Sequence, residues 1–476
     1  MKKNTLYRIY SAVFIGACIA PAVLMPFSSS DGSMEKRELA KAPSLHSEDG
    51  SLNEQFFSQF DDWFSEHFAF RQQLVTADGR LKTALFNTSP DTDVIYGTDG
   101  WLYYGETTDD FLNINTLSQR EINGIVHDLR LVDEYCRSLG ADFIFTVAPN
   151  KSSVYPEHMP SNYAPADEPD NYALLSSQLS DTDFFCDMKD ALISAGSNIP
   201  LYHKTDTHWN GLGAYAGHTA LMRMLGHDVC PAGDWYTRDD RLGDLAAMIY
   251  PSEPAKDTQV YSSYEYTYSY QGRFRALDDI TINTISPSGS GDLLMFRDSY
   301  GEAILPYMAE VFETAEFSRV VPYRIENIGS DGYDTVILEI VERNIPRLAA
   351  SSPIMPAPEV QLPDGNAQAW LGELDEKENS SRFGGLTIKA EESGSYIRIY
   401  GALPELFFSD SSHRILITAG ESTYEAFCGS ELADSGNGFS AYLPADTDIS
   451  AFTVICDNAE GADMSVWVTE DMLSND

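Results

Sequence analysis

Short apolar runs alternate with helical patterns through the middle of the chain, and this alternation limits the folds that it can adopt. A capping box, Ser118 followed by Glu121, opens a helical pattern that ends at Gly140, and an apolar strand pattern follows at 143–147. Further strands are expected at 201–204, at 293–296, near 320 and at 336–341, and helices at 172–179, 188–195, 213–225 and 302–312. Strands separated by helices favour a mostly parallel sheet with helices on both faces. The sequence therefore predicts an α/β core.

The segments on either side of this core follow other patterns. An aromatic stripe at helical spacing between Phe56 and Phe64 is interpreted as core packing. Residues 94–104 are typical of a hairpin around a Gly-Thr-Asp-Gly turn. Beyond a Pro- and Ser-rich stretch at 351–358, short apolar strands alternate with Gly, Ser, Asp and Asn clusters, which predicts a C-terminal β-sandwich.

Together these patterns divide the chain of 476 residues into five parts. Residues 1–30 are expected to form a signal anchor or signal peptide, 31–110 a leader with a helical and hairpin extension, 111–350 the α/β domain that carries the chemistry, 351–380 a linker, and 381–476 a β-sandwich accessory domain.

Two segments about ninety residues apart hold the parts of a nucleophilic site. Asp206 and His208 stand two residues apart, and Ser299 lies between an apolar strand and the start of a helix. A serine hydroxyl is a weak nucleophile until an imidazole takes its proton and a carboxylate orients that imidazole. In an extended stretch, positions i and i+2 point to one face, so Asp206 and His208 are expected to project together. The carboxyl end of a parallel strand is where open α/β sheets hold their chemistry.

Four further side chains are candidates for binding substrate or an oxyanion. Arg297 and Tyr300 flank the serine, and Asn150 and Lys151 follow the strand at 143–147. Asn150 serves equally well as a loop cap in this position. The sequence shows no Cys or His spacing typical of a zinc site and no nucleotide-binding loop, so neither a metal nor a cofactor is expected.

The N-terminal sequence indicates export. Lys2, Lys3 and Arg8 precede an apolar run at 9–27, a pattern typical of a secretory signal or an uncleaved signal anchor. The remainder of the chain is therefore expected outside the cytoplasm, anchored to the membrane or secreted if the segment is cleaved.

A formal net charge of −42 restricts the partners. Binding to nucleic acid requires clustered Lys and Arg, so nucleic acid is excluded as a partner. A strongly anionic polymer is disfavoured for the same electrostatic reason, whereas a neutral glycan is easier to accommodate.

Several motifs occur in an order that resembles the alginate O-acetyltransferase-like (DHHW-motif) family, which has an SGNH-hydrolase-like domain. The resemblance covers roughly residues 35–350, and its motifs are Gly97–Tyr103, Pro149–Lys151, Asp206–Asn210, Gly243–Leu245 and Glu339–Asn344. Thr207 stands where the family motif has His, but the Asp and the second His are kept.

This resemblance implies transfer of acetyl groups to hydroxyls of a cell-surface or secreted polysaccharide. It implies Ser299 as the nucleophile, His208 as general base and acid, and Asp206 as the orienting carboxylate. It also implies a membrane-embedded acyltransferase as the acetyl supplier. For the C-terminal domain it suggests carbohydrate binding by architecture alone, and a structural cap or a protein-contact domain fits this region equally well. Two alternatives share these residues: a carbohydrate acetylesterase with water as acceptor, and a non-catalytic glycan-binding or assembly protein.

Overall fold

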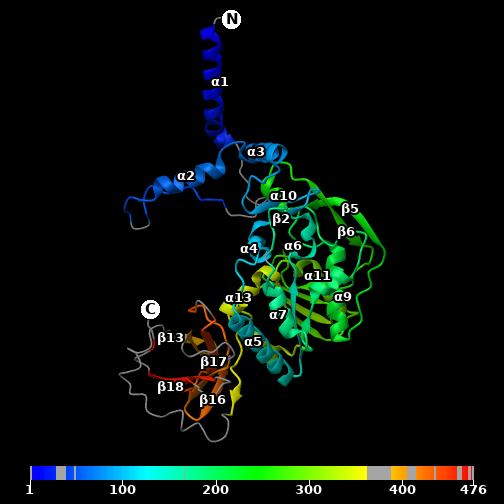
Figure 1. Cartoon of the computed structure of the whole chain (residues 1–476), viewed down its shortest axis with the longest axis vertical. Coiled ribbons are helices and arrows are strands. Elements are labelled where there is room, and N and C mark those ends of the chain that lie inside the picture. The colour runs from blue at the N-terminus through cyan, green and yellow to red at the C-terminus, as the bar shows by residue number, and fades with distance from the viewer. Residues whose placement is uncertain are drawn as a thin grey trace.

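A computed structural model describes residues 3–27, 39–47, 50–165, 167–361, 387–404, 414–433, 436–457, 464–469 and 473. Figure 1 shows an apolar N-terminal helix, an α/β body and a C-terminal β region. Most of the linker expected at 351–380 lies outside the described residues, as does part of the leader expected from residue 31.

A seven-stranded sheet forms the centre of the body, in the order β4-β3-β11-β9-β10-β8-β7. Its strands are β3 (Asp142–Ala148), β4 (Phe185–Cys186), β7 (Ser269–Gln271), β8 (Thr281–Ile285), β9 (Asp292–Phe296), β10 (Thr314–Ser318) and β11 (Thr335–Val341). The first five strands in the sheet order pair in parallel, and β8 and β7 add antiparallel at one edge. The sheet is therefore mixed but mostly parallel, as the sequence predicts.

The two faces of this sheet bury different side chains at a period of two. Ile144, Met295 and Ile337 pack with one group of helices, whereas the neighbouring Phe145 and Leu338 pack with another. The first group comprises α8 (Met188–Ser194), α9 (Gly211–Leu225) and α11 (Gly301–Val311), and the second comprises α5 (Gln119–Ser138), α7 (Asn171–Leu179) and α13 (Ile345–Ala350). Helices on both faces leave the strand ends as the open edge of the body.

Shorter elements surround that edge. They are α4 (Thr108–Phe111), α6 (Lys151–Val154), α10 (Asp244–Ile249), the hairpin of β1 (Val94–Tyr96) with β2 (Leu102–Tyr104), and the antiparallel ribbon of β5 (Trp235–Leu242) with β6 (Lys256–Ser262). The short helix α12 (Ile328–Asp331) instead precedes the amino end of β11. On the N-terminal side lie α1 (Lys3–Leu24), α2 (Phe56–His67) and α3 (Arg71–Phe86). The expected hairpin at 94–104 is confirmed by the β1–β2 pairing.

The C-terminal region consists of two antiparallel sheets. One has the order β12-β16-β15-β18-β19 and the other β13-β14-β17. The strands are β12 (Glu359–Val360), β13 (Thr387–Ser393), β14 (Tyr396–Ala402), β15 (Arg414–Ala419), β16 (Ser422–Ala426), β17 (Gly438–Pro444), β18 (Ala451–Asp457) and β19 (Met464–Thr469). Side chains of both sheets share one buried apolar cluster. The β-rich character is as expected, while the sandwich topology remains a prediction.

Three local expectations differ from the structure. Residues 201–204 form no strand but one side of a tight loop, closed by a single bridge between Tyr202 and Trp209. The strand expected near 320 ends earlier, at Ser318. The aromatic helix α2 has no buried residue, so its stripe is not core packing. The capping box is confirmed, because Ser118 and Glu121 exchange side-chain and backbone hydrogen bonds.

Asp128 of α5 supports a prediction about stability. Its carboxylate accepts a hydrogen bond of 2.7 Å from the Cys428 N–H of the C-terminal region, and burial raises the pKa of Asp128 well above its ordinary value of 3.8. The folded protein therefore holds this proton more tightly than the unfolded chain, and the free energy of unfolding falls as the pH rises above that value. Asp128→Asn keeps an oxygen that can accept the Cys428 N–H, but the amide side chain does not ionise in this pH range.

We expect the melting temperature of Asp128→Asn to decline less than that of the unmodified protein between about pH 4 and pH 7, where Asp titrates. Thermal unfolding across this pH range measures the difference. Asp142→Asn, at an exposed carboxylate, is the control and keeps the original slope. Parallel pH profiles for Asp128→Asn and the unmodified protein would contradict the expectation.

Candidate active site

The carboxyl ends of β9 and β11 lie side by side, and the residues that follow them form one wall of the candidate site. After β9 the chain makes a short turn through Asp298 and Ser299 before α11 begins at Gly301. Asp298 caps both segments: its Oδ1 accepts the Tyr300 N–H at 2.8 Å, and its Oδ2 accepts the Val341 N–H at 2.7 Å. The position of the serine is thereby fixed against the neighbouring strand.

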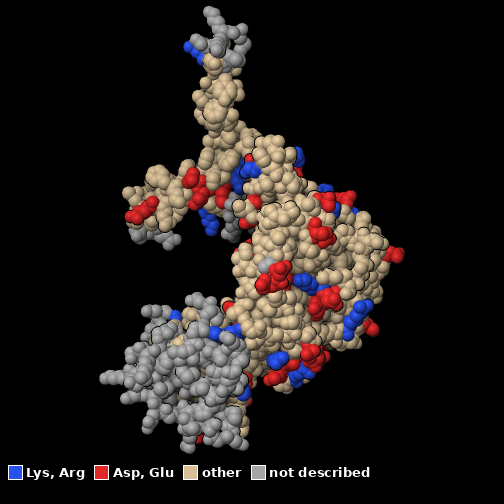
Figure 2. All heavy atoms as spheres, viewed as in Figure 1, with Lys and Arg blue, Asp and Glu red and all other residues tan. Residues whose placement is uncertain are grey.

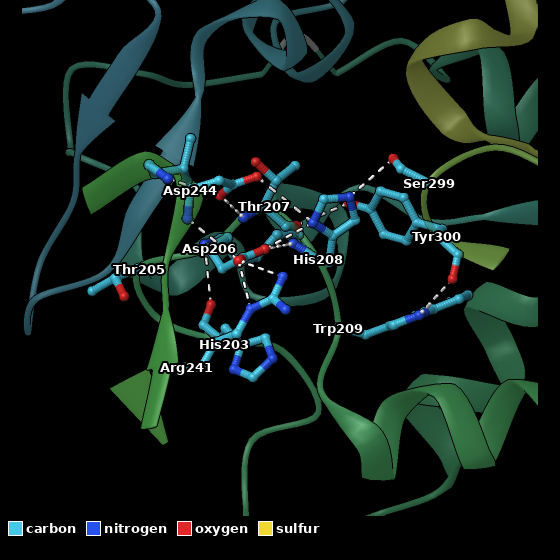
Figure 3. A network of polar contacts seen from close by, with 12 residues as sticks. His203, Thr205, Asp206, Thr207, His208, Trp209, Arg241, Asp244, Ser299 and Tyr300 are labelled. Atoms are coloured by element: carbon cyan, nitrogen blue, oxygen red, sulfur yellow. Dashed lines mark hydrogen bonds and ion pairs between the residues drawn. The ribbon is translucent and has the colours of Figure 1, made fainter. Parts of the chain in front are cut away.

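Three side chains from two distant segments form a continuous hydrogen-bonded chain (Figure 3). The Ser299 Oγ lies 2.9 Å from His208 Nε2, and His208 Nδ1 lies 2.8 Å from Asp206 Oδ1. Both distances are within the range of good hydrogen bonds. With the Nδ1 proton directed at the carboxylate, Nε2 is the acceptor that faces the serine hydroxyl. The structure thus brings together the three residues that the sequence singles out.

The carboxylate of Asp206 is fully buried and saturated with donors. Its Oδ1 also accepts the His208 N–H, at 3.0 Å. Its Oδ2 accepts Arg241 Nε at 2.9 Å and the Asp244 N–H at 3.3 Å, and Arg241 Nη2 lies 2.8 Å away. Burial alone would raise the pKa of Asp206, but the hydrogen bonds and charges of His208 and Arg241 hold it well below its ordinary value. The group is therefore an anion at neutral pH.

The loop that carries Asp206 and His208 is compact rather than extended. The His203 N–H donates to His208 O at 3.2 Å, and the Asn210 N–H donates to Leu201 O at 2.8 Å. Asp206 and His208 meet because the backbone bends between these two bonds. The expected contact between the two side chains therefore forms, but the extended strand from which it was predicted does not. His203 points away, with Nδ1 3.0 Å from Thr258 O.

Two glycines permit the close approaches that this site requires. A Cβ on Gly243 would lie 2.2 Å from Thr205 O, so only glycine lets the start of α10 reach the loop. A Cβ on Gly301 would lie 2.6 Å from the Arg297 Cβ, which the turn after Ser299 cannot accommodate. The resemblance motif at 243–245 and the turn after Ser299 therefore each include a glycine that is needed for backbone contact.

The four candidate substrate-binding side chains are engaged in holding these loops together. Lys151 Nζ donates to three carbonyl oxygens of the loop, those of His203, Lys204 and Asp206, at 2.7–3.2 Å. Burial lowers the pKa of Lys151 to about 8. Asn150 Nδ2 donates to Asp110 Oδ2 at 2.6 Å.

Arg297 and Tyr300, on the serine turn, are also directed into the protein. Arg297 Nη2 donates to Leu277 O at 2.7 Å, and the Tyr300 hydroxyl donates to Thr207 O at 3.0 Å. The structure therefore does not bring these two side chains, nor those of Asn150 and Lys151, to the open side of Ser299. Their geometry fits a positioning role better than the expected contact with substrate.

A cavity of about 560 Å³ opens in front of Ser299 and His208. Its other lining residues are Arg71, Asp91, Asp93, Tyr104, Thr207, Asp244, Met248 and Arg343. The guanidinium of Arg343 lies over the rings of Tyr104 and Tyr300, at 5.5 and 5.9 Å. The hydroxyl–imidazole pair is therefore reachable from solvent, in a space large enough for a sugar ring.

Sequence reasoning missed Arg241 and Asp244. Arg241 lies on the β5–β6 ribbon, which carries no site-like motif, and Asp244 belongs to a resemblance motif without an assigned role. Asp206, His208 and Asp244 each place one potential metal-ligand atom within 4.8 Å of the others, a spacing that could hold a cation. Arg241 already supplies positive charge to Asp206, which makes a metal electrostatically less favourable there.

The fold and the site define an α/β protein with a hydrogen-bonded chain of Ser299, His208 and Asp206 beside its central sheet. Residues 94–274 match the model of the family described as SGNH hydrolase-like domain, acetyltransferase AlgX. Over this segment the chain is similar to that family, as the sequence motifs indicate. The matched segment includes Asp206 and His208 and ends before Ser299.

Two curated relatives that are similar to part of the chain are both named as probable alginate O-acetylases. The chain is 24% identical over 214 residues to a probable alginate O-acetylase AlgJ of Pseudomonas syringae pv. tomato, and 26% identical over 219 residues to its namesake in Pseudomonas aeruginosa. These alignments cover 44% and 43% of this chain and 50% and 53% of the relatives, so the chain spans about half their length. A solved DHHW family protein from Eubacterium siraeum is 19% identical, with a TM-score of 0.40, over 53% of this chain and 91% of its own.

The contacts of Asp206 predict a role for Arg241. Arg241→Met removes the charge that faces the buried carboxylate, so the pKa of Asp206 rises and His208 is less firmly oriented. We expect the rate at which a serine-directed sulfonyl fluoride modifies Ser299 to fall by about 10- to 100-fold. Arg241→Lys keeps the charge but not the paired geometry, so a smaller loss is expected.

Arg238→Met is the matched control, because this arginine lies on the same strand and stacks on Tyr236 and Tyr261 instead. Mass spectrometry of the labelled protein over time measures the rates. Labelling of Arg241→Met at the rate of the control would rule out the positioning role.

Proposed function

We propose that this protein is an extracytoplasmic O-acetyltransferase that moves acetyl groups through an acyl-enzyme on Ser299 to hydroxyls of a polysaccharide. The observation that carries the proposal is the hydrogen-bonded chain from Ser299 Oγ through His208 to Asp206, at 2.9 and 2.8 Å. The alginate O-acetylase names of the curated relatives support the same reaction class. The N-terminal apolar segment Tyr7–Phe27, which is 21 residues long with a hydropathy of 1.9, supports membrane anchoring.

The first half-reaction acetylates the enzyme. Ser299 Oγ attacks the carbonyl carbon of the acetyl donor while His208 Nε2 accepts the hydroxyl proton, and the imidazolium is stabilised by Asp206. The bond between the acetyl carbon and the donor's leaving oxygen or sulfur then breaks, and His208 returns its proton to the leaving atom. The acetyl group now forms an ester with Ser299.

The second half-reaction uses the same groups in reverse. A sugar hydroxyl enters the cavity, loses its proton to His208 Nε2 and attacks the acyl carbon. The serine ester bond breaks, and Ser299 Oγ recovers the proton from His208. Arg343, whose guanidinium lines the cavity over Tyr104 and Tyr300, is suited to bind an oxygen of either substrate.

The acetyl donor in this proposal is supplied at the membrane. We propose that a membrane-embedded acyltransferase passes the acetyl group across the bilayer to the anchored chain. The C-terminal β region is proposed as an accessory domain that contacts the glycan. Neither role is needed for the chemistry at Ser299.

Esterase activity is the second candidate, because an acyl-enzyme reacts with water as readily as with a sugar when water has access. The cavity in front of Ser299 opens to solvent, so water can reach the proposed acyl-enzyme. Turnover of a small acetyl ester with and without added oligosaccharide separates the two reactions: a transferase forms acetylated sugar at the expense of free acetate.

Removal of the nucleophile tests catalysis directly. Ser299→Ala leaves no oxygen to attack the donor, so we expect acetyl turnover to fall by about 1,000-fold or more, and His208→Ala to act similarly. The double variant should lose little more, because the two residues act as one unit. Release of acetate and the acetylated peptide containing residue 299 are measured by mass spectrometry.

Ser177→Ala, an exposed helix position whose hydroxyl bonds only Leu174 O among the described contacts, is the control. A glycan-binding or assembly protein without catalysis would show equal turnover in Ser299→Ala and the control, and no acetylated Ser299.

The negative charge of the chain predicts a preference among acceptors. With a net charge of −42, the protein repels polyuronates, so a neutral oligosaccharide should be the better acceptor at low salt. Raising the salt to about 0.15 M shortens the Debye length to about 8 Å, so the difference between the transfer rates to the two acceptors should become smaller. Initial rates of transfer to neutral and uronate oligomers of equal length, each at both salt concentrations, measure it. Faster transfer to the uronate at low salt would contradict this expectation.

A further inference from the structure

Helix α2 carries an aromatic face that the body of the protein does not bury. None of its residues is buried, and the side chains of Phe57 and Phe60 are 83% and 43% exposed. The rings of Phe56, Phe60 and Phe64 stack along one side of the helix, at centroid distances of 6.2 and 6.1 Å. An apolar helix face of this kind marks an interaction surface.

Helix α3 also has an exposed apolar side, and its opposite side packs on the body of the protein. Leu74, Leu81 and Leu85, spaced seven and four residues apart, lie on one side and are 50%, 58% and 64% exposed. The opposite side packs on the body: Thr76 Oγ1 accepts the Ser252 N–H at 3.0 Å, and a Cβ on Gly79 would lie 2.6 Å from Ile249 O. The outward side of α3 is therefore an apolar stripe whose orientation is fixed by the fold.

The position of both helices relative to α1 indicates what covers these surfaces. The Ala69 N–H, between α2 and α3, donates to Pro21 O near the end of α1 at 3.2 Å. Figure 1 shows α2 and α3 running crosswise to α1 at this end. The apolar segment Tyr7–Phe27, which runs through α1 and the short turn after it, is long enough to span a bilayer, and none of its most apolar window is buried in the folded chain. With α1 in the membrane, the Pro21 end lies at the bilayer surface, and α2 and α3 lie at the same level.

We propose that α2 and α3 are interfacial helices, which lie in the surface of the same bilayer that α1 spans and insert the α2 aromatic face and the α3 leucine stripe among the lipids. Crosswise helices with one apolar face are the form in which peripheral segments bind a membrane surface. The surface does not depend on the acyl chemistry proposed for Ser299.

The charge distribution defines the lipid chemistry that suits this surface. Asp61, Asp62 and Glu66 lie on α2, and Figure 2 shows acidic side chains gathered over this helix. Anionic lipid headgroups would be repelled by these carboxylates and by the net charge of the chain. The attraction is therefore apolar, and a zwitterionic bilayer is the favoured partner.

This placement brings the candidate active site to the membrane. A groove of about 440 Å³, lined by Leu74, Val75 and Pro90 among others, shares Asp91 and Met248 with the cavity in front of Ser299. Arg71, the first residue of α3, also lines that cavity. The open side of the cavity therefore borders the helix that we place on the lipid surface.

Tryptophan reporters in the full chain test the proposal. The chain is reconstituted into phosphatidylcholine vesicles with or without phosphatidylcholine brominated on its acyl chains, which quenches only nearby indoles. Phe57→Trp and Leu81→Trp report the two stripes, and Val13→Trp reports α1. The matched control is Leu139→Trp. Leu139 is 44% exposed and follows the last residue of α5, a helix that Figure 1 shows well away from α1. The quenching of the unmodified chain is subtracted throughout.

We expect the emission added by Phe57→Trp and Leu81→Trp to be quenched at least about twofold more than that of Leu139→Trp, and Val13→Trp to be quenched most, because interfacial helices insert only about 5–10 Å. Partial replacement with phosphatidylglycerol should weaken quenching at position 57 and leave position 13 unchanged. Quenching at 57 and 81 no greater than at 139, or an unquenched Val13→Trp, would overturn the proposal. Each reporter replaces an exposed side chain, so the fold is retained.

Discussion

A single buried negative charge organises the candidate site. Taking a carboxylate out of water is costly unless donors replace the lost hydration, and Asp206 recovers this cost through His208, Arg241 and the amide of Asp244. These partners come from the compact loop and from the segment in which β5 leads into α10, and neither belongs to the central sheet. The hydrogen bonds that stabilise this one anion therefore join two peripheral segments of the body. The imidazole that faces Ser299 is oriented by the same network.

The sequence predicts the parts of this structure that depend on local pattern. Alternating strands and helices indicate the α/β core, the capping box marks the start of α5, and the three residues of the hydrogen-bonded chain are recognised by type and context. The parallel arrangement then follows, because helical crossovers return successive strands in the same direction.

The remaining features depend on contacts through space. Arg241 reaches Asp206 from an exposed ribbon, and no periodicity reports which carboxylate a guanidinium will meet. Lys151 was expected in the substrate crevice, but three carbonyl oxygens of the compact loop bind its ammonium group. The aromatic periodicity of α2 correctly indicates a helix with an apolar face, yet the pattern is the same whether protein or lipid covers that face.

The serine turn and the histidine loop are also bound to each other behind the reacting atoms. The Tyr300 hydroxyl donates to Thr207 O, and Trp209 Nε1 donates to Tyr300 O at 3.1 Å, with both rings buried. Ser299 and His208 are thus preassembled, and no ligand is needed to bring them into register. In the proposed acyl transfer, such a site reacts as soon as a carbonyl arrives, so the group that occupies the mouth of the cavity decides between a sugar and water as acceptor. Selectivity between the two acceptors would then depend on which molecule occupies the cavity, and not on a rearrangement of Ser299 and His208.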